Sequence, residues 1–221
     1  MKLFLSSYRL GDHGDLFAQM AGGPGARVAI IPNAADAYPL EAQFAYTRTI
    51  LNPLTWFDPW GLDAAIIDLR SFFGQTADLA RVLRRYQAIW APGGNSFLLR
   101  RAMRDSGFDT ILGDLLADGM TYGGFSAGAC VIGDDMRAVA IMDAPDETAP
   151  GHVTSDPIMT GLGLVPFTII PHIDSDSAEA EAAAKAVAYA QAEGIAHVAL
   201  RDGEVIVRRG DAIETLARKG D

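Results

Sequence analysis

Short runs of consecutive apolar residues alternate along this chain with longer segments in which apolar residues recur every three or four positions. A continuous apolar run bounded by turn residues, such as RVAIIP at 27–32, is typical of a strand buried on both faces of a parallel sheet, and we interpret 64–69 as another buried strand. The longer segments have the spacing of helices with one apolar face. These patterns predict strands at 2–6, 27–32, 64–69, 88–91, 167–171, 196–200 and 205–207, and a strand from 121 that breaks at 123–124. They predict helices at 40–51, 75–85, 96–106, 109–119, 127–132 and 176–193, and one that follows a loop within 11–20.

The alternation of strands with helices of about ten residues has a direct consequence for the fold. Such alternation is typical of βαβ crossovers, in which helices cover both faces of a sheet. We therefore expect an α/β protein with three layers and a doubly wound, mostly parallel sheet. With 221 residues and 49% hydrophobic content, the chain is long enough for a large core, and we expect one domain over residues 1–221.

The charge balance and the cysteine count narrow the classes of function. The chain carries 18 basic and 28 acidic residues, a formal net charge of −10. Nucleic acids and anionic membranes attract basic surfaces, so we expect neither as a partner. The single cysteine, Cys130, excludes an intramolecular disulfide, and we interpret it as a packing residue. Without a signal-peptide pattern or an apolar run of eighteen residues, we expect a cytoplasmic protein.

The strongest chemical signal lies at 121–132, where the predicted strand passes directly into a helix. Gly124-Phe125-Ser126-Ala127-Gly128 fits G-x-S-x-G, in which glycines flank a serine because the turn is too tight for a Cβ atom. The turn would hold the Ser126 hydroxyl out as a nucleophile, and the N–H of Ala127 would meet an oxyanion there. The alternative is an ordinary packing turn between strand and helix.

A second turn, at 93–96, follows the predicted strand 88–91. Successive N–H groups of Gly93 and Gly94 can form a concave anion site, and Asn95 or Ser96 can cap the following helix. The turn lacks the spacing of a phosphate loop. We favour the second half of an oxyanion hole, donated by Gly94 and with Gly93 and Asn95 as auxiliary residues. A plain helix-capping turn is the alternative.

His172 follows the predicted strand 167–171, at the strand end where open α/β sheets place their sites. By itself, such a histidine is more often structural than catalytic. However, GGFSAGA at 123–129, APGGNSF at 91–97 and IIPHID at 169–174 occur together and in this order. Over roughly residues 27–208, this set of motifs resembles the peptidase E (aspartyl dipeptidase) and cyanophycinase family of serine peptidases.

The resemblance implies a flavodoxin-like fold related to class I glutamine amidotransferases, with His172 as the general base. The family carries the third triad member, a glutamate, in a Leu-Pro-Glu-Gly turn. Here Leu200-Arg201-Asp202-Gly203 places Asp202 at that position, with a side chain one methylene shorter. Asp-Gly is also a common hairpin turn.

An aspartate of the region around Asp143 has been implicated in the family as well. The alternative is that Asp143 is a solvated loop acid. It lies in the long segment 133–166, which we expect to cover the site.

Together these residues predict a serine peptidase that acts through Ser126, His172 and Asp202 and forms an acyl-enzyme. The expected substrates are short peptides, above all dipeptides with an N-terminal aspartate, because cyanophycinases are longer chains. The chemistry requires no metal and no cofactor, and the resemblance makes a homodimer plausible.

Two other functions stay open at this point. An esterase of the α/β-hydrolase type would need Asp174 or Asp176 together with His197, and a regulator on the same fold would only bind a small molecule. Asp176 also has a structural interpretation, since it stands three residues before Glu179 in capping-box spacing. The remaining histidines, His13 and His152, are interpreted as structural or surface residues.

The loop 52–61 contains Trp56, Phe57 and Trp60 within five residues. Clustered aromatic residues are favoured at interfaces between proteins. They also pin a loop to its own core, and this second interpretation is preferred here.

Overall fold

The structure, a computed structural model, describes residues 1–38, 52–176 and 178–220. Its strands are β1 (Lys2–Ser6), β2 (Arg27–Ile30), β3 (Asp63–Ile66), β4 (Ala88–Ala91), β5 (Thr121–Phe125), β6 (Thr168–Ile170), β7 (His197–Ala199), β8 (Val205–Arg209) and β9 (Ala212–Leu216). Its α-helices are α1 (Gly14–Ala21), α3 (Thr76–Leu83), α4 (Ser96–Asp105), α5 (Phe108–Ala117), α6 (Ala127–Cys130) and α7 (Glu179–Ala192). The helix predicted at 40–51 lies outside the described residues.

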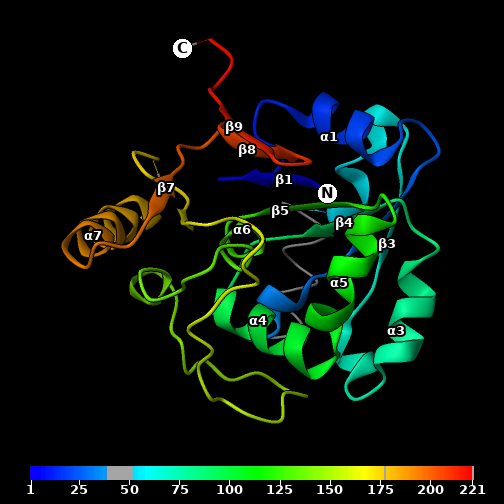
Figure 1. Cartoon of the computed structure of the whole chain (residues 1–221), viewed down its shortest axis with the longest axis horizontal. Coiled ribbons are helices and arrows are strands. Elements are labelled where there is room, and N and C mark those ends of the chain that lie inside the picture. Colours follow the sequence, from blue (N-terminus) through cyan, green and yellow to red (C-terminus); the bar gives the residue numbers. More distant parts are fainter. Residues whose placement is uncertain (39–51, 177, 221) are drawn as a thin grey trace.

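Seven strands form the central sheet, in the order β3-β2-β4-β5-β1-β8-β9. The five strands from β3 to β1 are parallel, and β8 and β9 extend the sheet in antiparallel fashion. The predicted α/β fold with a mostly parallel sheet is thus confirmed. Figure 1 shows α1 on one face of this sheet and α3, α4 and α5 on the opposite face.

Alternate residues of a strand point to opposite faces of a sheet, and β1 shows how this divides the core. Leu3 and Leu5 belong to the apolar cluster that includes α3, α4 and α5, whereas Phe4 belongs to the cluster with α1. All three side chains are fully buried. Helices therefore cover the sheet on both faces, which gives the three predicted layers.

One predicted strand has a different place in the fold. The sequence suggested that 167–171 joins the main sheet. Among the described strands, however, β6 pairs with β7 alone, in a separate two-stranded parallel sheet. Helix α7 covers this small sheet and contributes three buried alanines to a cluster around Ile170. The apolar run did not reveal the difference, because a strand covered by a helix is buried in either sheet.

Three further predictions of local structure are corrected. Strand β3 was expected to be buried on both faces, but it forms the edge of the sheet, and Ile66 is 48% exposed. Strand β5 does not break at Gly123 but continues to Phe125; a Cβ atom on Gly123 would lie 2.5 Å from the Trp90 ring, so glycine serves packing here. Helix α6 ends at Cys130, two residues earlier than expected.

The aromatic residues of the loop 52–61 pack against their own core, as preferred above. Phe57 is fully buried, with its ring 5.5 Å from that of Phe17 and 5.7 Å from that of Trp90. Trp56 and Trp60 are partly buried against the same cluster. Within the described ranges, no helix is both long and apolar enough to cross a membrane.

Candidate active site

Ser126 stands on the turn between β5 and α6 with φ of +50° and ψ of −117°, a conformation that residues other than glycine rarely adopt. The turn is tight because β5 and α6 approach the neighbouring strand β4 closely. A Cβ atom on Gly128 would lie 2.0 Å from the carbonyl oxygen of Ala91, and one on Gly124 would lie 2.6 Å from that of Gly128. Both glycines of the motif are thus required by sterics.

The surroundings of Ser126 offer donors to a developing negative charge. In the part of the chain that the structure describes, the N–H groups of Gly94 and Ala127 have no hydrogen-bond acceptor. Gly94 has φ of +140° and lies against Ala34, whose carbonyl oxygen would be 2.3 Å from an added Cβ atom. Gly94 and Ser126 line the same cavity, and Ala127 directly follows Ser126 in the chain.

His172 and Asp202 form a pair. The Nδ1 atom of His172 lies 2.9 Å from Oδ1 of Asp202, and the His172 side chain is only 3% exposed. His172 itself has φ of +63°, a backbone conformation that residues other than glycine rarely adopt. Burial would raise the pKa of Asp202, but hydrogen bonds from His172 and Ser7 outweigh burial and hold this pKa below its usual value. The carboxylate is therefore well suited to orient the imidazole.

The hairpin interpretation of Asp202-Gly203 is wrong. The turn connects β7 of the small sheet with β8 of the main sheet, and these two strands do not pair with each other. Asp202 instead accepts a hydrogen bond of 2.6 Å from the Ser7 hydroxyl, and this hydroxyl also accepts one of 2.8 Å from the His172 N–H. Sequence reasoning missed Ser7, because nothing near it in the chain marks a site.

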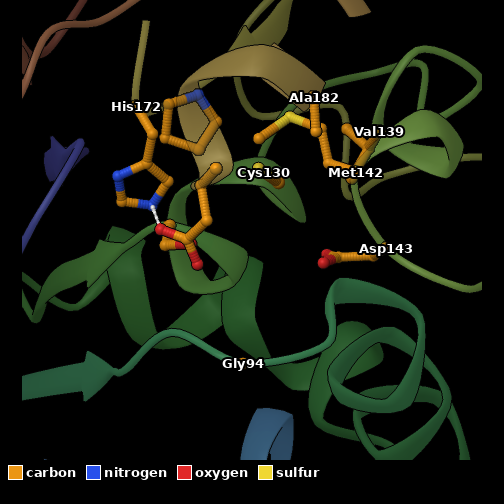
Figure 2. A pocket seen from close by; sticks show the side chains of 10 residues that line it. Gly94, Cys130, Val139, Met142, Asp143, His172 and Ala182 are labelled. Atoms are coloured by element: carbon orange, nitrogen blue, oxygen red, sulfur yellow. Dashed lines mark ion pairs between the residues drawn. The ribbon is translucent and has the colours of Figure 1, made fainter. Parts of the chain in front are cut away.

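The other nitrogen of His172, Nε2, lies 3.5 Å from a carboxylate oxygen of Glu179, and a dashed line marks this contact in Figure 2. Glu179 begins helix α7, whose N-cap is Ala178 without a side-chain hydrogen bond, so the predicted capping box with Asp176 is wrong. Among the described residues, the Ser126 hydroxyl makes no hydrogen bond. Ser126, His172 and Glu179 nevertheless line one cavity of about 50 Å³.

Asp143 points into this cavity from the side opposite His172 (Figure 2). Its Oδ2 accepts hydrogen bonds from the N–H and the hydroxyl of Ser96, at 2.9 and 2.5 Å. Burial raises the pKa of Asp143 above its usual value, and the bonds from Ser96 oppose this shift. The interpretation as a solvated loop acid is therefore wrong, and the segment 133–166 does reach the cavity.

Asn95 connects the same segment to helix α4. Its Oδ1 caps the helix by accepting from the N–H groups of Phe97 and Leu98, at 2.9 and 3.0 Å, and its Nδ2 donates to the Ala144 carbonyl at 2.9 Å. Gly93 lies beside Asn95, and a Cβ atom there would be 3.1 Å from the Cβ of Ser126. The turn 93–96 therefore caps α4 and borders the site at once.

A larger cleft of about 650 Å³ opens from this cavity. Aromatic side chains and three carboxylates form much of its wall, and no lysine or arginine lines it among the described residues. These aromatic and acidic side chains are Tyr8, Tyr38, Trp56, Phe125, Asp143, Glu147 and Glu179. In the described part of the chain, no group of three or more His, Cys, Asp or Glu side chains is arranged to hold a metal ion.

The remaining histidines lie outside this arrangement. His197 bonds through Nδ1 to the carbonyl of Ile195. Among the described residues it makes no ion pair or hydrogen bond with Asp174 or Asp176, which the esterase alternative needs. His13 contacts the carbonyl of Ala217, and His152 is buried against Asp36, at 2.8 Å. Cys130 is fully packed, and burial raises the pKa of its thiol.

This chain is similar to several known proteins. The family model described as peptidase family S51 matches residues 4–216. A probable alpha-aspartyl dipeptidase of Drosophila melanogaster is 31% identical over 77% of this chain and 65% of its own length. A peptidase E of Streptomyces coelicolor is 33% identical over 69% of this chain and 54% of its own length. The chain thus spans less than two thirds of these relatives.

A solved structure supports the fold. The crystal structure named "Putative Peptidase E Protein", from Listeria monocytogenes, superimposes with a TM-score of 0.77 and covers 97% of both chains, at 24% identity. At this identity the match establishes a common fold.

Proposed function

The chain belongs to peptidase family S51, and on this premise we propose that it is a serine peptidase that hydrolyses short peptides. The observation that supports the proposal most is the shared cavity of Ser126 and His172, with Asp202 bonded to the far side of the imidazole. A nucleophile, a base and a carboxylate that orients the base are the requirements of acyl transfer.

In the proposed mechanism, the bond to Asp202 keeps the proton of the neutral imidazole on Nδ1, so that Nε2 can accept another. For this step Nε2 leaves its contact with Glu179 and reaches Ser126. It then takes the hydroxyl proton as Oγ bonds to the carbonyl carbon of the peptide. The carbonyl oxygen becomes an oxyanion, which the N–H groups of Ala127 and Gly94 stabilise.

The tetrahedral intermediate then collapses. The C–N bond breaks, and the imidazolium donates its proton to the leaving amine, which departs. Water, deprotonated by the same imidazole, attacks the ester between the acyl group and Ser126. This second step releases the acid and restores the Ser126 hydroxyl, so that no cofactor is consumed.

For the substrate we propose dipeptides with an N-terminal aspartate, on the likeness to relatives named aspartyl dipeptidase and peptidase E. The three carboxylates of the cleft, Asp143, Glu147 and Glu179, suit the α-ammonium group of a free peptide N-terminus. An exopeptidase should therefore reject a substrate whose amino group is acetylated.

A substrate panel tests this proposal. We expect Asp-Leu to be cleaved, Asn-Leu and Leu-Leu to be cleaved much more slowly, and acetyl-Asp-Leu and a short-chain nitrophenyl ester to be poor substrates. The Ser126→Ala variant is the control for each substrate. Preference for Leu-Leu or for the acetylated peptide would contradict the aspartyl specificity, and fast ester cleavage without peptide cleavage would favour an esterase.

Labelling identifies the nucleophile independently of the substrate. A fluorophosphonate probe should label the wild type on the peptide that contains Ser126, as mass spectrometry of a digest can determine. Intact Ser126→Ala protein with wild-type turnover, or label on another serine, would refute the mechanism through Ser126 and leave a hydrolase with a different nucleophile.

A further inference from the structure

Ser7 lies directly after β1, which runs between β5 and β8 in the main sheet. The residue is fully buried. Its hydroxyl oxygen lies 2.6 Å from Oδ1 of Asp202, 2.8 Å from the N–H of His172 and 3.3 Å from the carbonyl of Leu200. One side chain thus contacts the carboxylate of the candidate pair and the backbone of its imidazole partner.

A serine hydroxyl has one proton to donate, and its oxygen accepts. The His172 N–H donates to Ser7, and the two possible acceptors of the Ser7 proton are Asp202 and Leu200. The contact with Asp202 is shorter by 0.7 Å, that is 3.3 minus 2.6 Å, so Asp202 receives the proton. The hydroxyl then donates to Asp202 and accepts from the His172 N–H, so its orientation depends on both residues of the pair.

The position of Ser7 in the fold gives these bonds their importance. His172 follows β6 of the small sheet, which has no strand pairing with the main sheet, whereas Ser126 belongs to the main sheet. The residue before Ser7 contacts the nucleophile, because the carbonyl of Ser6 accepts a hydrogen bond of 3.2 Å from the Ser126 N–H. Adjacent residues at the end of β1 therefore bind the nucleophile and the base–acid pair.

We propose that Ser7 is a positioning residue, whose hydroxyl sets the distance and orientation of the His172–Asp202 pair relative to Ser126. The proposal rests on the peptidase activity proposed above. Ser7 does not line the cleft or the cavity, so it acts through His172 and Asp202 and not on the substrate. Its loss should reduce kcat and leave KM nearly unchanged.

The test compares Ser7→Ala and Ser7→Cys with the wild type on the best substrate of the panel. Cysteine fills nearly the same space as serine but is a weak donor, so it separates the hydrogen bond from packing. Because small misplacements of catalytic groups are costly, we expect both variants to lose about 10²-fold in kcat with KM within about twofold. Ser7→Thr, which keeps the hydroxyl, should recover most of the activity if the extra methyl group is accommodated.

A second measurement distinguishes positioning from a general structural role. In the Asp202→Asn background, Ser7→Ala should cost much less than in the wild type, because the two residues act as one unit. Multiplicative losses would show that Ser7 acts independently and would overturn the proposal. Ser106, another fully buried serine, bonds to carbonyls of helix α4, and Ser106→Ala should keep wild-type kcat.

The outcomes for the two proposals are distinguishable. If Ser126→Ala abolishes turnover while Ser7→Ala and Ser7→Cys keep wild-type kcat, the peptidase mechanism stands and the role of Ser7 is refuted. If Ser126→Ala remains active, both are refuted, since the pair that Ser7 would position has no nucleophile to activate. Thermal melting of each variant shows whether it is folded, so that a loss of kcat is compared only between folded proteins.

Discussion

The two sides of the candidate site are held in different ways. Ser126 stands between β5 of the main sheet and helix α6, and main-chain packing determines its position. Cβ atoms added at Gly124 and Gly128 would overlap carbonyl groups. His172 and Asp202 follow strands of the small sheet, and side-chain hydrogen bonds with each other and with Ser7 determine theirs.

This difference predicts how each side responds to substitution. Where the main chain is closely packed, an added methyl group has no room, and the cost appears as lost stability. Where hydrogen bonds orient side chains, an isosteric change leaves the fold intact, and the cost appears as lost rate. The following predictions test this contrast, beginning with the largest effect.

Asp202→Asn should have the largest effect on rate while leaving the protein folded. An amide at this position favours the wrong imidazole tautomer, a change that costs up to about 10⁴ in kcat in a well-studied triad. Asp143→Asn is the matched control, because an amide oxygen can still accept from Ser96, and it should lose less than about tenfold. Steady-state kinetics with both variants decides the order; a larger loss in Asp143→Asn would transfer the third catalytic role to Asp143.

Gly128→Ala should reduce stability on the nucleophile side. The new Cβ atom would lie 2.0 Å from the carbonyl oxygen of Ala91, so β4 and α6 must separate. Overpacking of this kind costs about 1–3 kcal/mol, which corresponds to a lower Tm by roughly 2–12 °C for a chain of this length. Gly113 in helix α5 has open space around it, and Gly113→Ala should keep or raise Tm. An unchanged Tm in Gly128→Ala would show that the turn between β5 and α6 is less closely packed than its geometry indicates.

The smallest effect concerns the pH dependence of stability on the base side. The pKa of Asp202 is lower in the folded protein than in the unfolded chain, so its ionised form stabilises the fold. This contribution is fully present above the unfolded pKa of about 4 and is lost as pH falls through the folded pKa. The Tm difference between wild type and Asp202→Asn should therefore be constant between about pH 5 and 7 and shrink below about pH 4. A difference that grows on acidification would contradict the assigned direction.

The order of strands and helices followed from apolar periodicity, because burial on one or two faces determines which residues a segment can use. Apolar periodicity could not show to which sheet a strand belongs. The sequence pattern of β6 is that of a strand in the main sheet, but β6 lies in the small two-stranded sheet. For the same reason, the edge position of β3 and the connection from β7 to β8 were not foreseen, since strand pairing is a contact between distant segments.

Within the site, the tight turn at Ser126 could be identified from the sequence. The close packing of this turn leaves no room for a Cβ atom at the residues two positions before and after Ser126, so both are glycine. Of the surroundings of His172, the sequence predicted Asp202 through the family resemblance, but neither Ser7 nor the contact with Glu179. The Ser7 hydroxyl meets residues 165 and 195 positions further along the chain, and Glu179 meets His172 only because α7 packs on the small sheet. Neither contact restricts which residues stand next to it in the chain, so neither produces a recognisable sequence motif. The sequence alone therefore determined the fold class and the candidate nucleophile, whose constraints are local, whereas the tertiary structure decided which polar groups surround the imidazole, because those contacts form only when distant segments come together.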